Sequence, residues 1–346
     1  MNALFAPKRV AATPIDGVDV VLADLDGVVY AGRHAIMHAV ESLNRVQLTK
    51  RVGYITNNAS RTDAQVGDHL RELGLTLVTE DVVTSPQAAM TLLKNMVDPG
   101  ATILVIGGEG LTVEVAKAGF VVTDSAEDAP AAVVQGFSPD LGWRHLAEAS
   151  FALNAKDAAG EPLNTPWLAT NMDWTIPVER GIAPGNGSLV SAVHLAVGRL
   201  PVVAGKPELP IFEEAMRRFE STSVLFIGDR LDTDILGANR AGIPSAVVLT
   251  GIDRAKQLLA APEGSRPTYI LGDLRELHEP YPESVTGKNG SVTVRGARVR
   301  KQGMEIVIER EGDNELDLLR AACRVIWDSG LAIYGFNVPE RLYIKK

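Results

Sequence analysis

The chain has 346 residues, of which 46% are hydrophobic and 22% charged, a composition that is ordinary for a soluble globular protein of two or three domains. Its formal net charge of −9 at pH 7 argues against non-specific binding to nucleic acid or to an anionic membrane surface, so we expect neither as a partner. A single cysteine, Cys323, excludes an intrachain disulfide, and no signal peptide or membrane span is recognisable, so we expect a cytoplasmic protein.

The first predicted element is a buried strand that ends in two aspartates. The hydrophobic run 18–23 is followed by Asp24-Leu25-Asp26-Gly27-Val28. Ligands bind at the carboxyl ends of the strands in open α/β sheets, so Asp24 and Asp26 are expected at an active-site edge. Two carboxylates two residues apart repel each other unless a cation or a proton lies between them, which indicates metal-linked chemistry. An ordinary turn is an equally good interpretation of this motif alone, whereas its spacing excludes an EF-hand calcium loop.

Hydrophobic spacing over 35–48 predicts the first helix. His34 and His38 lie four residues apart near its start. We interpret them as exposed side chains rather than a zinc site, because no cysteine or other metal motif is near.

A second strand over 51–55 runs into Thr56-Asn57-Asn58. This places the Thr56 hydroxyl at the carboxyl end of a second parallel strand. Alone, Thr and Asn here are typical of a turn. Ser60 and Asp63 have the spacing of a capping box and predict the start of the next helix.

Residues 85–201 continue the α/β pattern but have the character of a separate unit. Strands are predicted at 102–106, 120–122, 132–135 and 167–169, and helices at 87–96, 111–117, 143–155 and 188–197. The stretch Thr170-Asn171-Met172-Asp173 and the loop 184–188 are predicted to face the acidic strand ends, with Asn171 and Asp173 helping to select the substrate. A capped helix start after a loop is the competing interpretation.

A lysine precedes the next predicted helix. Gly205-Lys206-Pro207 follows a short hydrophobic stretch, Pro207 suits a first helical position, and the helix itself is predicted over 211–219. Helix starts favour anions, so Lys206 is a candidate ligand for one, although most lysines are simply solvated.

Another hydrophobic strand, 223–228, ends in an acidic motif. Asp229 follows it directly and Asp234 lies five residues later. Surface loops do not explain why two buried-type strands, far apart in the sequence, both end in aspartates. A helix to residue 241 and further strands of the same sheet at 246–249 and 269–271 are expected.

The tail begins with a linker-like segment at 281–290. It continues with strands at 291–294, 305–309 and 341–344 and a helix at 315–327. This small α+β unit is of marginal independent size, so we expect it to dock onto the main body.

Four strand ends supply the candidate chemistry, with Asp24, Asp26, Thr56, Lys206, Asp229 and Asp234. This set suits phosphoryl transfer, in which a protein mainly positions groups and stabilises charge. Carboxylates, a backbone carbonyl and waters can bind Mg²⁺, and a carboxylate can act as the nucleophile.

These four motifs, in this order, resemble those of the haloacid dehalogenase superfamily. The insert resembles the α/β cap of its NagD-type, p-nitrophenyl phosphatase-like branch. The resemblance covers roughly residues 15–278 and implies an α/β fold class, with a doubly wound parallel-sheet (Rossmann-like) core and a large inserted α/β cap. The pattern of the tail adds a small C-terminal α+β domain. We expect the core at 1–84 and 202–280, the cap at 85–201 and the C-terminal domain at 281–346.

The resemblance also implies roles for the candidate residues. Asp24 would attack phosphorus to give an aspartyl-phosphate, while Asp26 would protonate the leaving group and then activate water. Asp24, the Asp26 carbonyl and Asp229 would hold Mg²⁺, with Asp234 in support. The phosphoryl group would be held by Thr56, the Asn57 backbone and Lys206. An aspartate at position 26 implies a phosphatase rather than a dehalogenase.

The whole arrangement, tail included, is similar to bacterial glycerol 3-phosphate phosphatases, in which the tail resembles a truncated acetyltransferase-like domain. Arg300-x-x-Gly303-x-Glu305 matches an acetyl-CoA loop only in part, and a predicted strand follows it, so we expect no acetyltransferase activity. The small phosphate-ester substrate could instead be pyridoxal phosphate, a sugar phosphate or a nucleotide. A phospho-accepting receiver and a catalytically silent binding protein are the distant alternatives, and a homo-oligomer stays open.

Overall fold

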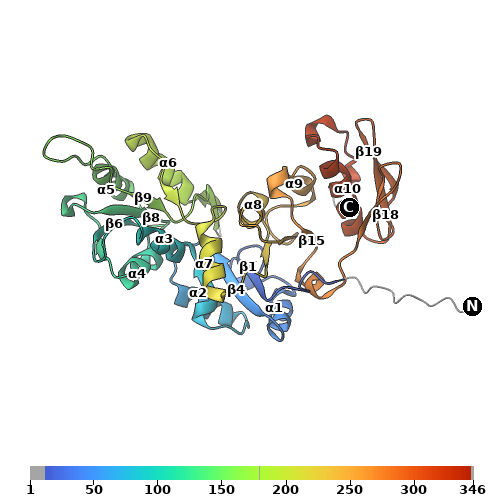
Figure 1. Ribbon diagram of the computed structural model, residues 1–346, viewed down its shortest axis with the longest axis horizontal. Helices are drawn as coiled ribbons and strands as arrows, with labels where there is room; N and C mark the ends of the chain where they lie inside the picture. The colour runs from blue at the N-terminus through green and yellow to red at the C-terminus, as the bar shows by residue number, and fades with distance from the viewer. Residues whose placement is uncertain (1–11, 179, 344–346) are drawn as a thin grey trace, which may run out of the picture.

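The computed structural model describes residues 12–178 and 180–343. Three parts, each built around a β-sheet, follow one another along its long axis (Figure 1). The central part holds a six-stranded sheet, and the chain leaves it for a five-stranded sheet before it returns. A four-stranded sheet ends the chain on the opposite side. Within the described ranges, every helix is too short or too polar to cross a membrane.

The central sheet is wholly parallel, with the strand order β15-β14-β13-β1-β4-β5. Its strands are β1 (Val20–Asp24), β4 (Arg51–Thr56), β5 (Val82–Thr84), β13 (Val224–Gly228), β14 (Ser245–Val248) and β15 (Tyr269–Leu271). The register pairs Ala23 of β1 with Ile227 of β13. Asp24 follows Ala23 directly and Asp229 follows Ile227 after Gly228, so the two aspartates leave the sheet from neighbouring strands.

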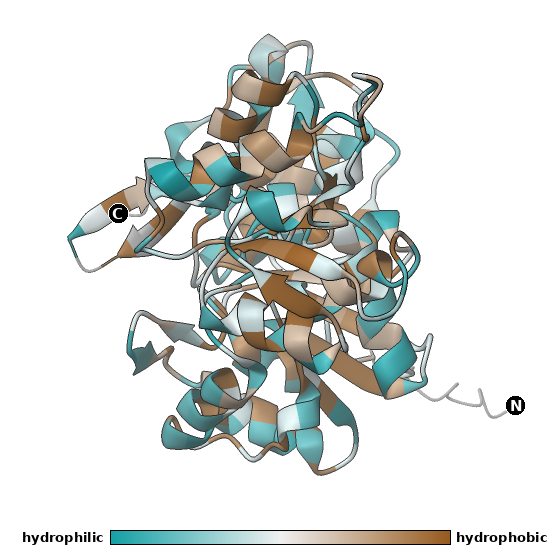
Figure 2. Ribbon diagram, turned by 90° about the vertical axis from the view of Figure 1, so that its left-hand side faces the viewer, coloured by the Kyte–Doolittle hydropathy of each residue, from teal (hydrophilic) through white to brown (hydrophobic). Residues whose placement is uncertain are grey.

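Helices cover both faces of this sheet, and β1 contributes to both hydrophobic layers. Val20 and Leu22 pack in one buried cluster, whereas Val21 and Ala23 pack in another. Figure 2 shows hydrophobic residues gathered on the strands and hydrophilic residues on the outward helix faces. Each fully buried Val or Leu side chain stabilises the fold by about 1.5–3 kcal/mol, so the strand ends are rigid supports for the loops that follow.

Three predicted features at helix starts are wrong. The first helix, α1 (Ala39–Gln47), begins four residues later than predicted, because His38 adopts a left-handed conformation with φ of 68°. The capping box of α2 (Asp63–Glu72) is formed by Thr62 and Gln65 instead of Ser60 and Asp63. In α7 (Pro210–Phe219), Pro210 rather than Pro207 occupies the first turn, and the Lys206–Pro207 peptide is cis.

The five-stranded sheet is also parallel, in the order β12-β9-β8-β6-β7. It contains β6 (Thr102–Ile106), β7 (Val121–Thr123), β8 (Ala132–Gln135), β9 (Trp167–Ala169) and β12 (Val202–Val203), with helices α3 (Ser85–Leu93), α4 (Glu109–Lys117), α5 (Trp143–Leu153) and α6 (Asn186–Val197). Because β12 pairs with β9, this sheet ends two residues beyond the predicted boundary at 201. An antiparallel hairpin of β10 (Thr175–Val178) and β11 (Gly181–Pro184), which the sequence did not predict, projects from it.

The C-terminal sheet is antiparallel and packs against one long helix, α10 (Glu315–Asp328). Its strands are β16 (Ser284–Thr286), β17 (Val292–Val294), β18 (Ala297–Gln302) and β19 (Glu305–Arg310). The predicted linker thus contains β16, and β18 was not predicted. The predicted closing strand is wrong, since residues 340–342 form a 3₁₀ turn and residue 344 lies outside the described residues.

Two further helical segments complete the side of the central sheet that faces this unit. A π-helical turn at Leu231–Ile235 leads into α8 (Leu236–Arg240), and α9 (Ala255–Leu259) follows β14. Both segments start directly after loops at the carboxyl ends of strands.

Candidate active site

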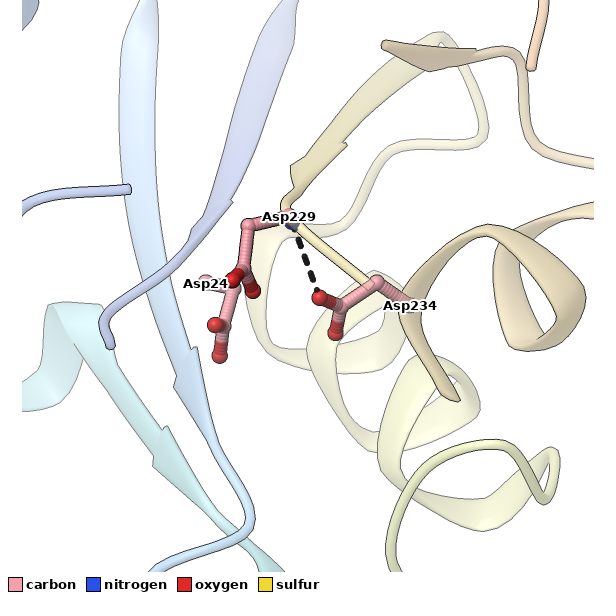
Figure 3. A group of neighbouring side chains, drawn as sticks. All are labelled: Asp24, Asp229 and Asp234. Atoms are coloured by element: carbon pink, nitrogen blue, oxygen red, sulfur yellow. Dashed lines mark hydrogen bonds between the residues drawn. The ribbon is translucent and has the colours of Figure 1, made fainter. Parts of the chain in front are cut away.

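Three aspartates meet where β1 and β13 end (Figure 3). Asp24 is the last residue of β1, Asp229 follows β13, and Asp234 comes from the π-helical turn. All three are buried, and each offers a carboxylate oxygen that lies within 4.8 Å of the other two. The predicted convergence of the two acidic strand ends is therefore present.

Main-chain groups hold two of these carboxylates in place. Oδ2 of Asp234 accepts hydrogen bonds from the N–H groups of Asp229 and Arg230, both at 3.1 Å. Oδ2 of Asp229 accepts one from the N–H of Ile252 at 2.6 Å. Asp234 thus holds the main chain of Asp229, while the loop after β14 holds the Asp229 carboxylate.

Two glycines make room for the Asp229 carboxylate. Gly27 has φ of +83°, a conformation that favours glycine, and a Cβ there would lie 2.2 Å from Asp229 Oδ2. A Cβ at Gly251 would lie 1.9 Å from the same oxygen. Neither position can carry a larger residue while Asp229 keeps its place.

The Lys206 ammonium group lies among the carboxylates. Its Nζ is 2.5 Å from Asp24 Oδ1 and 2.7 Å from Asp234 Oδ1, and the side chain is only 4% exposed. Burial opposes the charged form of Lys206, but the carboxylates of Asp234 and Asp24 outweigh it and raise its pKa. Lys206 is thus a permanent positive charge inside the site.

The carboxylates carry more negative charge than one lysine can balance. Burial raises the pKa of Asp24 well above its ordinary value, and Asp234 and Asp229 raise it further against the opposing effect of Lys206. Burial and the charge of Asp234 raise the pKa of Asp229 to about 7. Desolvated acids with raised pKa values are stabilised by a bound cation, so the cluster favours one.

The cluster fits a divalent cation in its donor set and its size. Mg²⁺ takes oxygen ligands at about 2.1 Å in octahedral geometry, which puts opposite ligands about 4.2 Å apart. Carboxylate oxygens within 4.8 Å of one another reach that spacing with small side-chain movements. Asp24 and Asp229 are the better candidate ligands, because both Asp234 oxygens already accept hydrogen bonds.

Asp26 lies apart from the carboxylate cluster. Its side chain is exposed toward the cavity, while the Gly27 N–H and the Tyr30 carbonyl close the tight turn behind it at 2.9 Å. Desolvation by the surrounding protein raises the pKa of Asp26, against the positive charges of Lys206 and Arg61, which lower it. A carboxyl that is easily protonated and faces the cavity is suited to proton transfer.

Asn57 connects the other predicted residues. Its side chain accepts a hydrogen bond from the Lys206 N–H at 2.9 Å and donates to the Lys206 carbonyl and to Asp173 Oδ1, both at 3.1 Å. The buried Asn171 donates to the Asn57 carbonyl at 2.7 Å. Thr56, also buried, accepts a hydrogen bond from the Asn58 N–H at 3.1 Å. Asn57 therefore ties the β4 end to Lys206 and to the five-stranded unit.

A cavity of about 530 Å³ opens above these groups. Its lining includes all the predicted site residues, Asp24, Asp26, Thr56, Asn57, Asn171, Asp173, Lys206, Asp229 and Asp234. The sequence analysis missed Ile176 and Ile182 from the β10–β11 hairpin and Arg230 after β13, which also line it. The position of Arg230 beside Asp229 was a usable signal, whereas nothing local marked the two isoleucines.

Two predicted residues, His34 and His38, lie outside this cavity. His34 is exposed and His38 is half-buried, and among the described residues the group of acidic, histidine and cysteine side chains close enough to share a metal consists of the three aspartates alone. The prediction of an exposed side chain is therefore confirmed for His34 and wrong for His38.

Comparisons with known proteins point to one family. A family model described as haloacid dehalogenase-like hydrolase matches residues 21–121, and a HAD-hydrolase-like model matches residues 203–277. The D-glycerol 3-phosphate phosphatase of Mycobacterium tuberculosis is 43% identical over 323 residues, which cover 91% of this chain and 87% of that protein. The acid sugar phosphatase of Staphylococcus aureus is 32% identical over 259 residues, with 74% and 95% covered.

Solved structures share the fold. A crystal structure of glycerol phosphate phosphatase from M. tuberculosis in complex with magnesium superposes with a TM-score of 0.83 at 40% identity and covers 95% of both chains. The p-nitrophenyl phosphatase from Archaeoglobus fulgidus gives a TM-score of 0.67 at 26% identity, with 75% of this chain and 98% of that chain covered. These structures confirm the predicted α/β fold class with its doubly wound parallel core.

Proposed function

Since the chain belongs to the haloacid dehalogenase-like hydrolase family, we propose that it is a magnesium-dependent phosphatase whose substrate is glycerol 3-phosphate, which it hydrolyses to glycerol and phosphate. The observation that carries this proposal is the Lys206 ammonium group in direct contact with Asp24 beneath the cavity. Identity of 43% to the M. tuberculosis glycerol 3-phosphate phosphatase, over most of both chains, supports the choice of substrate.

In the first step, an Asp24 carboxylate oxygen attacks phosphorus and the bond to the ester oxygen breaks. Asp24 lies at the rigid end of β1, and its contact with Lys206 holds its Oδ1 in place. Asp26 gives its proton to the departing alkoxide, so that glycerol leaves as a neutral molecule and Asp24 carries the phosphoryl group. The raised pKa of Asp26 supports this role, because it favours the protonated form that the step needs.

In the second step, the ionised Asp26 takes a proton from water as the water oxygen attacks phosphorus. The bond between Asp24 and phosphorus breaks, which releases inorganic phosphate and restores the carboxylate. Lys206 would neutralise a phosphoryl oxygen, and the Thr56 hydroxyl with the Asn57 main chain would hold the others. Asn57 is kept in position by Asn171 and by Lys206 itself.

Asp24 and Asp229 would hold Mg²⁺ together with the Asp26 carbonyl, while Asp234 supports the site. The bound ion would neutralise charge on the phosphoryl oxygens and on the carboxylates that lie close together. The M. tuberculosis glycerol phosphate phosphatase structure in complex with magnesium supports this assignment.

We also propose the division into a core (1–84 and 202–280), a cap (85–201) and a C-terminal domain (281–346). The separate sheets support it, although β12 moves the end of the cap sheet to residue 203. The likeness of the C-terminal domain to a truncated acetyltransferase-like domain is part of the same proposal. We expect no acetyltransferase activity, because the segment Arg300–Glu305 turns through Gly303 from β18 into β19.

Steady-state phosphate release from a panel of esters tests the substrate. We expect kcat/KM for glycerol 3-phosphate to exceed that for pyridoxal 5′-phosphate, a hexose phosphate and a nucleoside monophosphate by at least about tenfold, which is about 1.4 kcal/mol in transition-state binding. If kcat/KM were higher for one of the other esters, that ester would replace glycerol 3-phosphate as the proposed substrate. The assignment of the protein as a phosphatase would still stand. A single turnover without continued release would favour a receiver protein instead.

A further inference from the structure

The C-terminal unit, residues 281–343, shares one buried hydrophobic cluster with the catalytic side of the central sheet. The cluster joins Leu231, Ile235, Val247, Leu258 and Leu259 of the central part to Val294, Val299, Ile306, Leu318 and Ile326 of the C-terminal unit. Leu231 and Ile235 bracket the turn that carries Asp234. The unit therefore has no core of its own that is separate from the site.

Helix α9 is fixed to the C-terminal helix α10, which lies beside it (Figure 1). Nε1 of Trp327 donates a hydrogen bond to the carbonyl of Leu258 at 3.1 Å, at the last turn of α9. Arg266 lies over the Trp327 ring at 5.8 Å and donates to the Trp327 carbonyl at 3.2 Å. These contacts set where α9 ends and, through it, where the preceding loop lies.

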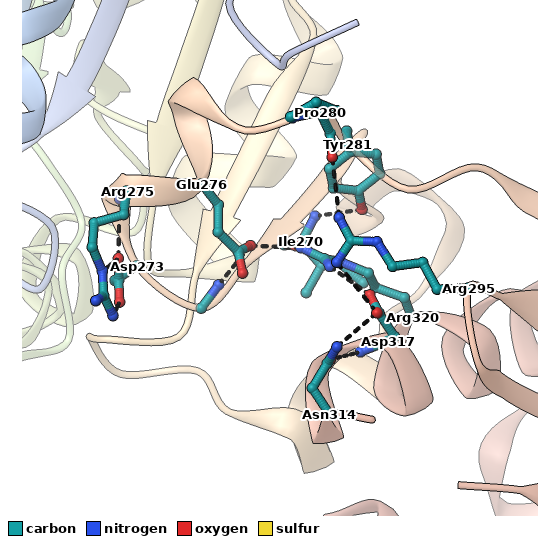
Figure 4. A network of polar contacts seen from close by, with 11 residues as sticks. Ile270, Asp273, Arg275, Glu276, Pro280, Tyr281, Arg295, Asn314, Asp317 and Arg320 are labelled. Carbon is teal, nitrogen blue, oxygen red and sulfur yellow. Dashed lines mark hydrogen bonds and ion pairs between the residues drawn. The ribbon is translucent and has the colours of Figure 1, made fainter. Parts of the chain in front are cut away.

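The same unit covers the edge strand of the central sheet, β15 (Figure 4). The outward N–H of Ile270 donates to the Tyr281 hydroxyl at 3.0 Å, and its carbonyl accepts from Arg320 Nε at 3.0 Å and Nη2 at 2.6 Å. Arg320 is 5% exposed and pairs with Glu276 at 2.6 Å and with Asp317 at 2.8 Å. An open edge strand would leave these main-chain groups unpaired. Because Tyr281 and Arg320 pair with them, the C-terminal unit also anchors β15.

The loop between β14 and α9, residues 249–254, connects these anchors to Asp229. Ile252 N–H donates to Asp229 Oδ2 at 2.6 Å, and Asp253 N–H donates to the Asp229 carbonyl at 3.2 Å. Asp253 Oδ2 accepts from the Leu231 N–H at 2.7 Å. The loop starts at a strand that β15 supports and ends in a helix that α10 supports.

We propose that the C-terminal unit is a positioning element for metal binding, which acts by holding the 249–254 loop against the Asp229 carboxylate. This inference rests on the proposed magnesium-dependent function, and it assigns the unit a role other than catalysis. Trp327 is its most specific positioning residue, because its indole N–H is the direct link from α10 to α9.

The test compares Trp327→Phe and Trp327→Ala in the full-length protein with Val299→Ala as the matched control. Val299 is buried in the same cluster but lies on β18, beyond α10 as seen from α9 in Figure 1. Two readouts are used well below the unfolding temperature of every variant. One is amide hydrogen exchange of the 249–254 segment in metal-free protein, and the other is the Mg²⁺ dissociation constant by calorimetry.

We expect Trp327→Phe to raise both the exchange rate of the Ile252 amide and the Mg²⁺ dissociation constant by about fivefold. A change of this size corresponds to the loss of one hydrogen bond. Trp327→Ala should do more, whereas Val299→Ala should lower Tm and leave both readouts unchanged. Unchanged exchange in Trp327→Phe, or an equal change in Val299→Ala, would overturn the proposal. If the unaltered protein bound no Mg²⁺, the proposed function would fail, while the exchange measurement would still decide the role of Trp327.

Discussion

Lys206 Nζ lies 2.5 Å from Asp24 Oδ1, although 182 residues separate the two in the chain. The five-stranded unit is inserted between them, so the contact requires the chain to leave the central sheet and return to it. The same ammonium group also contacts Asp234 at 2.7 Å. One lysine thus pairs with a carboxylate at the end of β1 and with another in the turn that follows β13.

Replacing this lysine should expose the repulsion that it balances. Lys206→Met leaves Asp24 and Asp234 buried without their positive partner, which typically costs about 3–5 kcal/mol of stability. We expect a lower Tm in metal-free protein and a larger rise in Tm on addition of Mg²⁺ than in the unaltered protein. Thermal unfolding with and without the ion measures both, and the exposed Lys94→Met is the control. An unchanged metal-free Tm would show that the ion pair has no stabilising role.

The pH dependence of stability should follow Asp229 in metal-free protein. The pKa of this carboxyl is raised to about 7 in the folded protein. At pH values between the ordinary pKa of an aspartate and about 7, the folded state therefore binds more protons than the unfolded state. Stability of metal-free protein should therefore fall as pH rises through this window. Saturating Mg²⁺, which favours the ionised form, should weaken or reverse that slope.

Tm measured from about pH 5 to about pH 8 tests this, and Asp229→Asn should flatten the metal-free slope. The same reasoning makes Mg²⁺ affinity rise with pH, because the ion competes with the Asp229 proton. A metal-free protein whose stability increased from pH 5 to pH 8 would contradict the raised pKa.

Gly251 should be intolerant of even one added methyl group. In Gly251→Ala the Cβ would lie 1.9 Å from Asp229 Oδ2, so the carboxylate must move away from its hydrogen bond with Ile252. Changes to groups that orient metal ligands typically weaken metal binding by about 10–100-fold, and we expect a loss in that range. Gly142→Ala, where a Cβ meets nothing within 4 Å, is the control for calorimetric Mg²⁺ titration. Equal affinities in the two variants would exclude this steric role.

Asp26→Asn should affect substrates according to their leaving groups. The glycerol alkoxide is a poor leaving group and needs a proton, whereas p-nitrophenolate leaves without one. Turnover of glycerol 3-phosphate should therefore fall by about 10²–10⁴-fold, and turnover of p-nitrophenyl phosphate should fall less. With p-nitrophenyl phosphate, intact-protein mass spectrometry should also show a phosphorylated enzyme, because water is no longer activated. Equal losses for both substrates, with no phosphorylated enzyme, would remove Asp26 from proton transfer.

Five of the six strands of the central sheet could be predicted from the sequence to within one or two residues, whereas β5, a strand of only three residues, was not predicted. Continuous runs such as 18–23 and 223–228 are typical of strands buried on both faces, and parallel pairing brings their ends to one edge. The β10–β11 hairpin escaped prediction because its strands are short and largely exposed, and β10 contains Pro177. β18 escaped because arginines and a lysine occupy half of its positions.

Convergence of the candidate site residues was predictable for the same reason, since strand ends carry Asp24, Thr56 and Asp229. The Asn57 side chain shows the limit of that reasoning. Its partners Lys206 and Asp173 lie 149 and 116 residues away, so no local pattern could have identified these hydrogen bonds. The link from Trp327 through α9 to the metal-binding loop likewise depends on packing between distant segments.

The most direct test of the central claim is phosphate release from glycerol 3-phosphate by Asp24→Asn at saturating Mg²⁺, compared with the unaltered protein and with Asp68→Asn on the surface of α2. We expect Asp24→Asn to lose turnover by at least about 10³-fold while its circular dichroism and cooperative unfolding stay native-like, and Asp68→Asn to keep full activity. Turnover by a folded Asp24→Asn variant at a rate near that of the unaltered protein would contradict Asp24 as the nucleophile.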